Sequence, residues 1–312
     1  MSREVRLRLL WHPQAQFVGY LLAQHSGLAR KRGIALTCEP IDFSQGGMAA
    51  LLEGACDLAI ASPAHLVESA APERLAFLMA VQQSSPLVYP VRRNAGIASP
   101  ADLAGRTAAV WPGGEDLEFR WMLRKAGLDP ARVTRLPTAD TVAALIDGKA
   151  DCAQMTVYHE LHEMEHRGLP LSEVTLFQPA DYGAALLKDG LIARRDWIGP
   201  EDALLQDLVE LFLEGWQLAF HDPEQAVALC RKLRPDMSDA HHRTQLGHMR
   251  DLAASGPALE QGFAVPDPDH VRRALAAMEE VDGHAPALDP AQVAVARYWA
   301  AAPAALKAMA WA

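Results

Sequence analysis

Aromatic side chains near the ends of predicted strands are the first candidates for a binding site. Trp11, Tyr20, Trp111 and Tyr158 occupy such positions. Aromatic faces stack on flat, weakly basic heteroaromatic ligands, and hydrogen bonds at the ligand's edge fix its orientation. Packing is the alternative role. The loop position of Trp11 favours ligand contact, Trp111 fits either role, and Tyr20 lies on an apolar helix face that is typical of a core.

Polar residues that suit hydrogen bonding accompany these aromatics. Gln16, Gln45 and Gln82 follow predicted strands and offer amide donors and acceptors. Ser62 begins a helix, where free backbone N–H groups meet an anionic or carbonyl oxygen, or where the serine simply caps the helix. Glu160 is the best acceptor for an exocyclic amine; alternatively it is only an acidic first-turn residue that complements the helix dipole. These residues predict a binding site for a small ligand.

Catalysis has little support in the sequence. The only acid–base pairing that we find joins His65 to Glu160 or Glu115. A lone helical histidine is more often packed or solvated than catalytic, but we keep His65 among the ligand-contacting candidates, together with Glu115. No catalytic residue is therefore predicted.

Metal binding is also not expected. The run His159–His166 spaces its histidines and glutamates three or four residues apart, which could gather zinc ligands on one helix face. It does not match HExxH, and most such runs are solvated helix faces. The cysteines form no CxxC pair and lie outside the predicted ligand loops, so buried free thiols are favoured over a disulfide or metal framework. They are Cys38, Cys56, Cys152 and Cys230.

The stretch from Val5 to Gly27 predicts how the elements position the candidates. Alternating apolar residues after Val5 indicate a strand, helical spacing begins at Phe17, and Gly27 marks a helix end. Strand patterns, alternating with helix patterns, recur at 34–41, 57–61, 75–81, 107–111 and 151–156, and an apolar stretch follows at 87–91. This order is typical of mainly parallel sheets, whose ligands bind beyond the carboxyl ends of the strands.

The last third of the chain reads as helices. They are predicted at 204–220, 223–233, 241–254, 268–281 and 290–302. Polar connections suggest that these helices pack on the outside of a lobe rather than form a third domain. The alanine-rich end at 300–310 has few apolar anchors and is expected to fray.

Composition narrows the classes of partner. The 312 residues carry 29 basic and 39 acidic side chains, a net charge of −10, and no basic cluster backed by aromatics. Nucleic acid and anionic membranes are therefore not expected as partners, and no apolar run is long enough to insert into a bilayer. The N-terminus shows no signal-peptide pattern, so we expect a cytoplasmic protein unless a signal has been trimmed.

Several short runs together resemble one family, which joins thiamine-pyrimidine synthases to periplasmic solute-binding proteins. The resemblance covers roughly residues 5–230 and depends on the order and spacing of the runs rather than on any single motif. The runs are 10–13, 19–20, 27–34, 59–63, 85–87, 99–103, 110–113, 156–161 and 181–183.

The resemblance implies a class II periplasmic-binding fold whose two α/β lobes close on a small ligand. Residues 1–90 and 186–312 would form the first lobe, which includes the C-terminal helices, and residues 91–185 would form the second, with the ligand cleft between them. Many relatives serve ABC importers for thiamine pyrimidine precursors. Glu160 falls at the family's binding glutamate, and Tyr182 joins the candidates through the last run. By this role the protein would be periplasmic and would work with an ABC permease.

The synthase branch of the family is a poor match. It carries a lysine that holds pyridoxal phosphate and a histidine four residues later; His65 matches the histidine, but Ala61 occupies the lysine position. The cysteine-rich run of that branch, expected near 182–187, is absent. Without an amine for a Schiff base, no cofactor and no synthase activity are expected.

Two functions remain. The first is a non-enzymatic binding protein that captures a small heterocycle, such as a hydroxymethyl or formylamino pyrimidine precursor of thiamine, for ABC import. The second is a cytoplasmic enzyme or ligand sensor on the same fold, related to thiamine pyrimidine biosynthesis, which the lack of a signal peptide favours. The residues themselves favour binding.

Overall fold

The chain divides into two compact units. The computed structural model describes residues 2–112 and 116–312. Unit 1 comprises Met1–Ser84, Leu187–Arg272 and Pro286–Ala312, and unit 2 comprises Ser85–Leu186 and Arg273–Ala285. The resemblance implies a first lobe that includes all of 186–312, whereas Arg273–Ala285 groups with unit 2.

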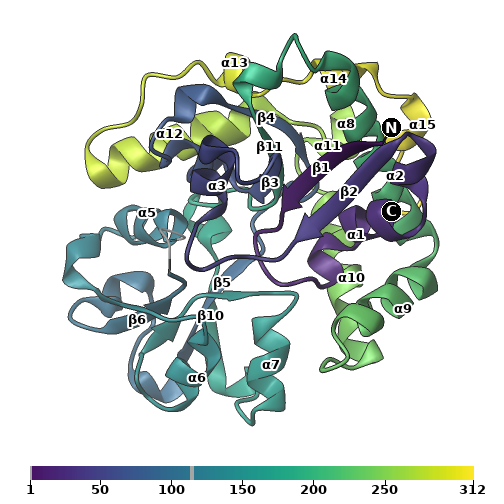
Figure 1. The fold of residues 1–312 in the computed structure, drawn as a ribbon. Helices are drawn as coiled ribbons and strands as arrows, with labels where there is room; N and C mark the ends of the chain where they lie inside the picture. Colours follow the sequence, from purple (N-terminus) through teal and green to yellow (C-terminus); the bar gives the residue numbers. More distant parts are fainter. Residues whose placement is uncertain (1, 113–115) are drawn as a thin grey trace. The chain divides into compact units, whose positions relative to one another are not determined.

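Unit 1 is built on a mainly parallel sheet (Figure 1). The strand order is β2-β1-β3-β11-β4, and β1 is parallel to both of its neighbours. Only β11 is antiparallel to the strands beside it, so it inserts between β3 and β4 in the opposite direction. The strands are β1 Arg3–Arg8, β2 Ile34–Glu39, β3 Leu58–Ala61, β4 Leu75–Ala80 and β11 Gly190–Arg194.

The start of β11 lies at the carboxyl edge of this sheet. Gly190 pairs with Ala61 at the end of β3 and with Ala80 at the end of β4. A Cβ atom on Gly190 would come within 2.1 Å of the Phe77 ring, so only glycine fits this position. The residue before it, Asp189, is therefore held at the edge where ligands bind in sheets of this kind.

Helices cover the sheet of unit 1. Buried leucines and aromatics repeat at helical spacing along α8, which packs closely on α1. Gly19 of α1 and Gly215 of α8 permit that approach, because a Cβ on Gly215 would meet the Gly19 carbonyl oxygen at 2.2 Å. The helices are α1 Val18–His25, α2 Leu28–Lys31, α3 Gly47–Glu53, α4 Pro63–Val67, α8 Asp202–His221, α9 Pro223–Leu233, α10 Asp239–Ala253, α11 Ala258–Gln261, α13 Pro290–Val293, α14 Arg297–Ala301 and α15 Ala304–Lys307. The helix α12 Pro268–Asp282 begins in unit 1 and ends in unit 2.

The C-terminus is anchored, so the expectation that it frays is wrong. Trp311 is buried against Phe220 and Phe263, with ring centroids 4.3 and 5.4 Å away. Its Nε1 donates to Gln217 Oε1 at 2.9 Å, while Gln217 Nε2 donates to the carbonyl oxygens of Leu306 and Ala308. The alanine-rich composition predicted few anchors, but Trp311 at the end of the segment is a large one.

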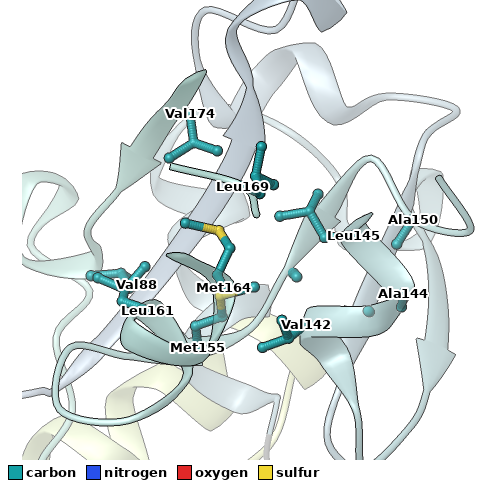
Figure 2. Close-up of a cluster of buried hydrophobic side chains, with 12 residues drawn as sticks. Val88, Val142, Ala144, Leu145, Ala150, Met155, Leu161, Met164, Leu169 and Val174 are labelled. Atoms are coloured by element: carbon teal, nitrogen blue, oxygen red, sulfur yellow. The ribbon is translucent and has the colours of Figure 1, made fainter. Parts of the chain in front are cut away.

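Unit 2 has a second α/β sheet. Its order is β10-β5-β8-β6-β7, with β6 parallel to β7 and β8, and β5 antiparallel to its neighbours; β9 also pairs with β5. The strands are β5 Leu87–Arg92, β6 Thr107–Val110, β7 Thr134–Pro137, β8 Cys152–Ala153, β9 Met155–Thr156 and β10 Val174–Phe177, and the helices are α5 Leu117–Lys125, α6 Thr141–Ile146 and α7 Glu160–His166. Figure 2 shows Met155 and Met164 in a hydrophobic cluster with Val142, Leu145 and Leu161.

The predicted α/β class, with helices flanking mainly parallel sheets, is confirmed. The single predicted strand at 151–156 is two short strands, β8 and β9, and the predicted helix at 290–302 is α13 and α14 separated by a break. Three strands, β7, β10 and β11, were not predicted. The partners of β10 and β11 are distant in the chain, whereas β7 is short and mostly exposed and so has no apolar pattern. Among the helices of the described residues, none combines the length and hydrophobicity needed to span a bilayer.

Candidate functional site

Buried polar side chains gather at the carboxyl edge of the unit 1 sheet. Gln14 and Gln16 lie on the connection after β1, Gln82 follows β4, and Asp189 precedes β11. Gln245 reaches them from α10. Each of these five side chains, which we call the Asp189 network, is at most 5% exposed. The network therefore combines residues from four separate parts of unit 1.

The hydrogen bonds of the network converge on one carboxylate oxygen. Gln16 Nε2 and Gln82 Nε2 donate to Asp189 Oδ2 at 2.9 and 2.7 Å. Gln14 Nε2 donates to Gln16 Oε1 at 2.7 Å, and Gln245 Nε2 donates to Gln14 Oε1 at 3.1 Å. A buried carboxylate needs such donors, since an unpaired charge in a protein interior is very costly. The backbone also fixes this point, because Val81 N donates to the carbonyl oxygen of Asp189 at 3.2 Å.

Tyr20 lies within the electrostatic reach of this carboxylate. Complete burial raises the pKa of its phenol, and the negative charge of Asp189 raises that pKa further. The phenol therefore stays neutral at physiological pH. Its ring packs edge-on against Phe212 and Trp216, with centroids 5.1 and 5.7 Å away, so Tyr20 is a core residue beside the network, as its position on an apolar helix face suggested.

Ser62 and His65 form a helix cap at the end of β3. Ser62 Oγ accepts from the backbone N of His65 at 3.1 Å and lies 2.7 Å from His65 Nδ1, which also accepts from the Ser62 backbone N at 3.2 Å. This is a reciprocal capping box for the short helix α4. These contacts match the alternative prediction that Ser62 caps the helix.

The other unit 1 candidates lie nearer the surface. Trp11 is half-buried and packs edge-on against His12 and Phe43, with centroids 5.8 and 5.4 Å away. Gln45 donates to Glu53 Oε2 at 2.7 Å. None of these contacts joins Trp11 or Gln45 to the Asp189 network.

The remaining candidates belong to unit 2. The backbone N of Trp111 donates to Gln154 Oε1 at 3.1 Å, Tyr158 is buried, and Tyr182 is half-buried at the end of a short 3-10 helix. Glu160 Oε2 accepts from the backbone N and the hydroxyl of Thr156, at 2.9 and 2.5 Å, so its carboxylate holds the turn that enters α7. This arrangement fits the local, helix-starting alternative for Glu160. Glu115 lies outside the described residues.

The histidine run forms most of helix α7. Leu161 and Met164 of this helix are buried, and Glu163 pairs with Arg167 at 3.2 Å. All four cysteines are free; Cys38 is partly exposed and the others are buried. Burial raises the pKa of Cys56 to about 11 and that of Cys230 to about 12, so both remain thiols at neutral pH.

The structure brings together some predicted residues and adds others. Gln16 and Gln82, 66 positions apart in the sequence, share one oxygen of Asp189, and Tyr20 lies beside it. Gln14, Asp189 and Gln245 were not among the residues predicted from the sequence. Lys188, also buried, was missed as well. One signal was available for Gln245: it lies one helical turn before Met249, on the buried face of α10. No sequence pattern pointed to Asp189, because the strand that follows it, β11, was not predicted.

Comparison with solved structures supports the fold. A protein from Bordetella bronchiseptica RB50 is 18% identical, covering 95% of this chain and 96% of its own, with a TM-score of 0.75. A putative periplasmic sulfonate-binding protein SsuA from Methylobacillus flagellatus KT is 19% identical over 98% and 95% of the two chains, with a TM-score of 0.70. The periplasmic nitrate-binding protein NrtA from Synechocystis PCC 6803 is 14% identical over 98% and 91%, with a TM-score of 0.71. The predicted periplasmic-binding fold is thereby confirmed.

Sequence comparison assigns the family. No curated protein matches the chain. The family model described as NMT1/THI5 like matches residues 14–226, a span that includes Gln14, Gln16, Gln82 and Asp189 but ends before α10. Because this match covers more than half of its residues, the chain belongs to the NMT1/THI5-like family.

Proposed function

We propose that this protein is the substrate-binding component of an ABC import system and captures a small heterocyclic ligand without changing it. The observation that carries the proposal is the Asp189 network, in which amide side chains from distant parts of unit 1 are held around one buried carboxylate. A network that is ordered before a ligand arrives lowers the conformational entropy lost on binding. Its position at the carboxyl edge of the sheet is where open α/β sheets bind their ligands.

A thiamine-type pyrimidine precursor is the ligand that we propose. The exocyclic amino group of such a ring donates hydrogen bonds, and carboxylate and amide oxygens are suitable acceptors. The family resemblance supports the same ligand class. The NrtA and SsuA structures are named for anions, nitrate and sulfonate, which makes anions the natural competing ligands in any test.

The contacts of the reactive groups support binding over catalysis. Ala61, at the position of the synthase lysine, is a buried strand residue paired with Gly190, and it supplies no amine. His65 Nδ1 is engaged by Ser62, and the cysteines remain thiols at neutral pH. A cytoplasmic enzyme or sensor is the alternative; the enzyme would reveal itself by consuming the ligand.

A thermal-shift screen of ligand-stripped protein tests the proposal. The panel contains hydroxymethyl and formylamino pyrimidines, thiamine, riboflavin, pyridoxal phosphate, propanesulfonate and nitrate. A pyrimidine at one hundred times its Kd is expected to add about 2.7 kcal/mol to the free energy of unfolding. Stabilisation by none of these compounds would contradict the proposed function, and conversion of a stabilising ligand would make the protein an enzyme.

Two amide variants link that shift to the network. Gln16→Leu and Gln82→Leu keep the approximate side-chain volume but remove a donor to Asp189, so each is expected to weaken pyrimidine binding by about 10-fold or more. Gln45→Leu is the matched control, because Gln45 lies in unit 1 but bonds to Glu53 instead. Equal pyrimidine affinities for all three folded variants, checked by circular dichroism, would place the ligand elsewhere.

A further inference from the structure

We infer that Gln82 and Gln245 determine ligand specificity, and that their side-chain oxygens select ligands that donate hydrogen bonds over oxyanions. This inference rests on the proposed function, since it concerns the same site. It goes further because it names the two residues that select the ligand and says that they favour hydrogen-bond donors. Gln245 lies in α10, beyond residues 14–226 that match the family model.

Asp189 sets the orientation of the first two amides. A carboxylate only accepts hydrogen bonds, so any amide that faces it must present its NH2 group. Gln16 and Gln82 both do so, at 2.9 and 2.7 Å from the same Oδ2 atom. Rotating either amide by half a turn would place a carbonyl oxygen against a negative charge. The orientation of both amides is therefore enforced by charge.

The same orientation passes along the network to α10. Because Gln16 turns its NH2 group to Asp189, its Oε1 faces Gln14, which must then donate, and does so at 2.7 Å. Gln14 consequently turns its own Oε1 to Gln245, which donates at 3.1 Å. Gln245 thus directs one of its two N–H groups to Gln14, and its Oε1 is the acceptor at this end of the network. One buried charge thus orients four amides, the last of which lies 56 positions from Asp189 in the sequence.

Both ends of the network are hydrogen-bond acceptors. Within residues 2–112 and 116–312, Oε1 of Gln82 and Oε1 of Gln245 are buried and form no hydrogen bond of ordinary geometry. The His242 ring lies beside Gln245: burial lowers the pKa of His242, and its contact with Gln245 opposes that shift. The two ends approach the same turn of α10: Gln82 Nε2 lies 3.6 Å from Met249 Sδ, and Met249 lies one turn after Gln245. Buried acceptors without donors are costly, so a ligand that brings N–H or O–H groups regains that free energy. An oxyanion would add further acceptors beside two carbonyl oxygens and a carboxylate.

Lys188 would favour the opposite preference, for an oxyanion. This buried residue precedes Asp189 and carries the charge that an oxyanion would need. If the site takes sulfonate or nitrate, Lys188 rather than the amide oxygens sets its specificity. The two possibilities predict opposite ligand preferences.

The test compares ligands of one shape and opposite polarity. Calorimetric titration measures Kd for a 4-amino-5-hydroxymethylpyrimidine, for its 4-oxo counterpart, and for propanesulfonate. The protein is expected to prefer the amino compound over the oxo compound by at least about 10-fold. Equal binding of the oxo compound would overturn the specificity assignment and leave the proposed function standing. Tighter binding of propanesulfonate, or binding of none of the three, would overturn both.

Variants distinguish a change in ligand preference from a general loosening of the site. Asp189→Asn replaces the carboxylate by an amide that can donate or accept, so the orientation of the network is no longer enforced. The amino-to-oxo preference is then expected to fall by about 10-fold or more, a ratio that a uniformly loosened site would leave unchanged. Gln245→Leu, which removes one end oxygen, is expected to lower the same ratio. Asp251→Asn, on the exposed side of α10, is the control and should leave it unchanged. A preference unchanged in both Asp189→Asn and Gln245→Leu would overturn the inference.

Discussion

Replacing Trp311 with alanine is expected to lower the free energy of unfolding of unit 1 by about 3–5 kcal/mol, the usual cost of removing a buried tryptophan. The side chain is 5% exposed and lies between Phe220 and Phe263. Its removal also takes the donor from Gln217 Oε1, the residue that holds the backbone at Leu306 and Ala308. The change should therefore release the C-terminal segment as well as open a cavity.

Urea unfolding followed by circular dichroism measures this effect. Trp311→Phe keeps an aromatic ring but loses the N–H donor, so its loss of stability should be smaller. Leu259→Ala, at a residue that is 66% exposed, is the control and should change stability by less than about 0.5 kcal/mol. A Trp311→Ala protein with unaltered stability would mean that the C-terminus is not anchored in solution.

The second large effect is expected from Gly215→Ala. A Cβ at this position would lie 2.2 Å from the Gly19 carbonyl oxygen and 3.2 Å from Ala23 Cβ, so α1 and α8 would have to separate. Overpacking of this kind costs about 1–3 kcal/mol or more, which exceeds the gain of up to about 1 kcal/mol that alanine brings to a helix. Since Gln16 lies in the short 3-10 helix that leads directly into α1, ligand binding should weaken in the same variant.

Gly247→Ala provides the opposite case. Gly247 lies within α10, and a Cβ there would meet nothing within 4 Å. Alanine should therefore stabilise the protein by about 0.5–1 kcal/mol through its helix propensity alone. Thermal melting of the two glycine variants should shift in opposite directions. A stabilised Gly215→Ala protein would show that α1 and α8 do not approach closely at this point.

Local signals made much of the fold predictable. The Ser62 cap, the end of α3 at Gly54 and the limits of α6 all depend on residues within a few positions of one another. Such contacts leave a pattern in the sequence because capping and glycine conformation act locally. Strand β11 leaves no such pattern, since its partners β3 and β4 lie more than 100 residues earlier.

The candidate site was predictable only in part, for the same reason. Gln16 and Gln82 were recognised because each follows a predicted strand, and parallel strands bring their carboxyl ends together. Asp189 was not, because burying a carboxylate requires donors that only the folded chain supplies. Tyr20 suited both a ligand and a core, and its contacts with Phe212 and Trp216 match the core alternative.

The most direct measurement of the central claim is a titration of ligand-stripped protein with a hydroxymethylpyrimidine, followed by mass spectrometry of the ligand recovered from the complex. We expect saturable binding of one ligand per chain, weakened by about 10-fold or more in Gln82→Leu, and recovery of the pyrimidine with its mass unchanged. A pyrimidine that does not bind, or that returns as a different compound, would contradict it.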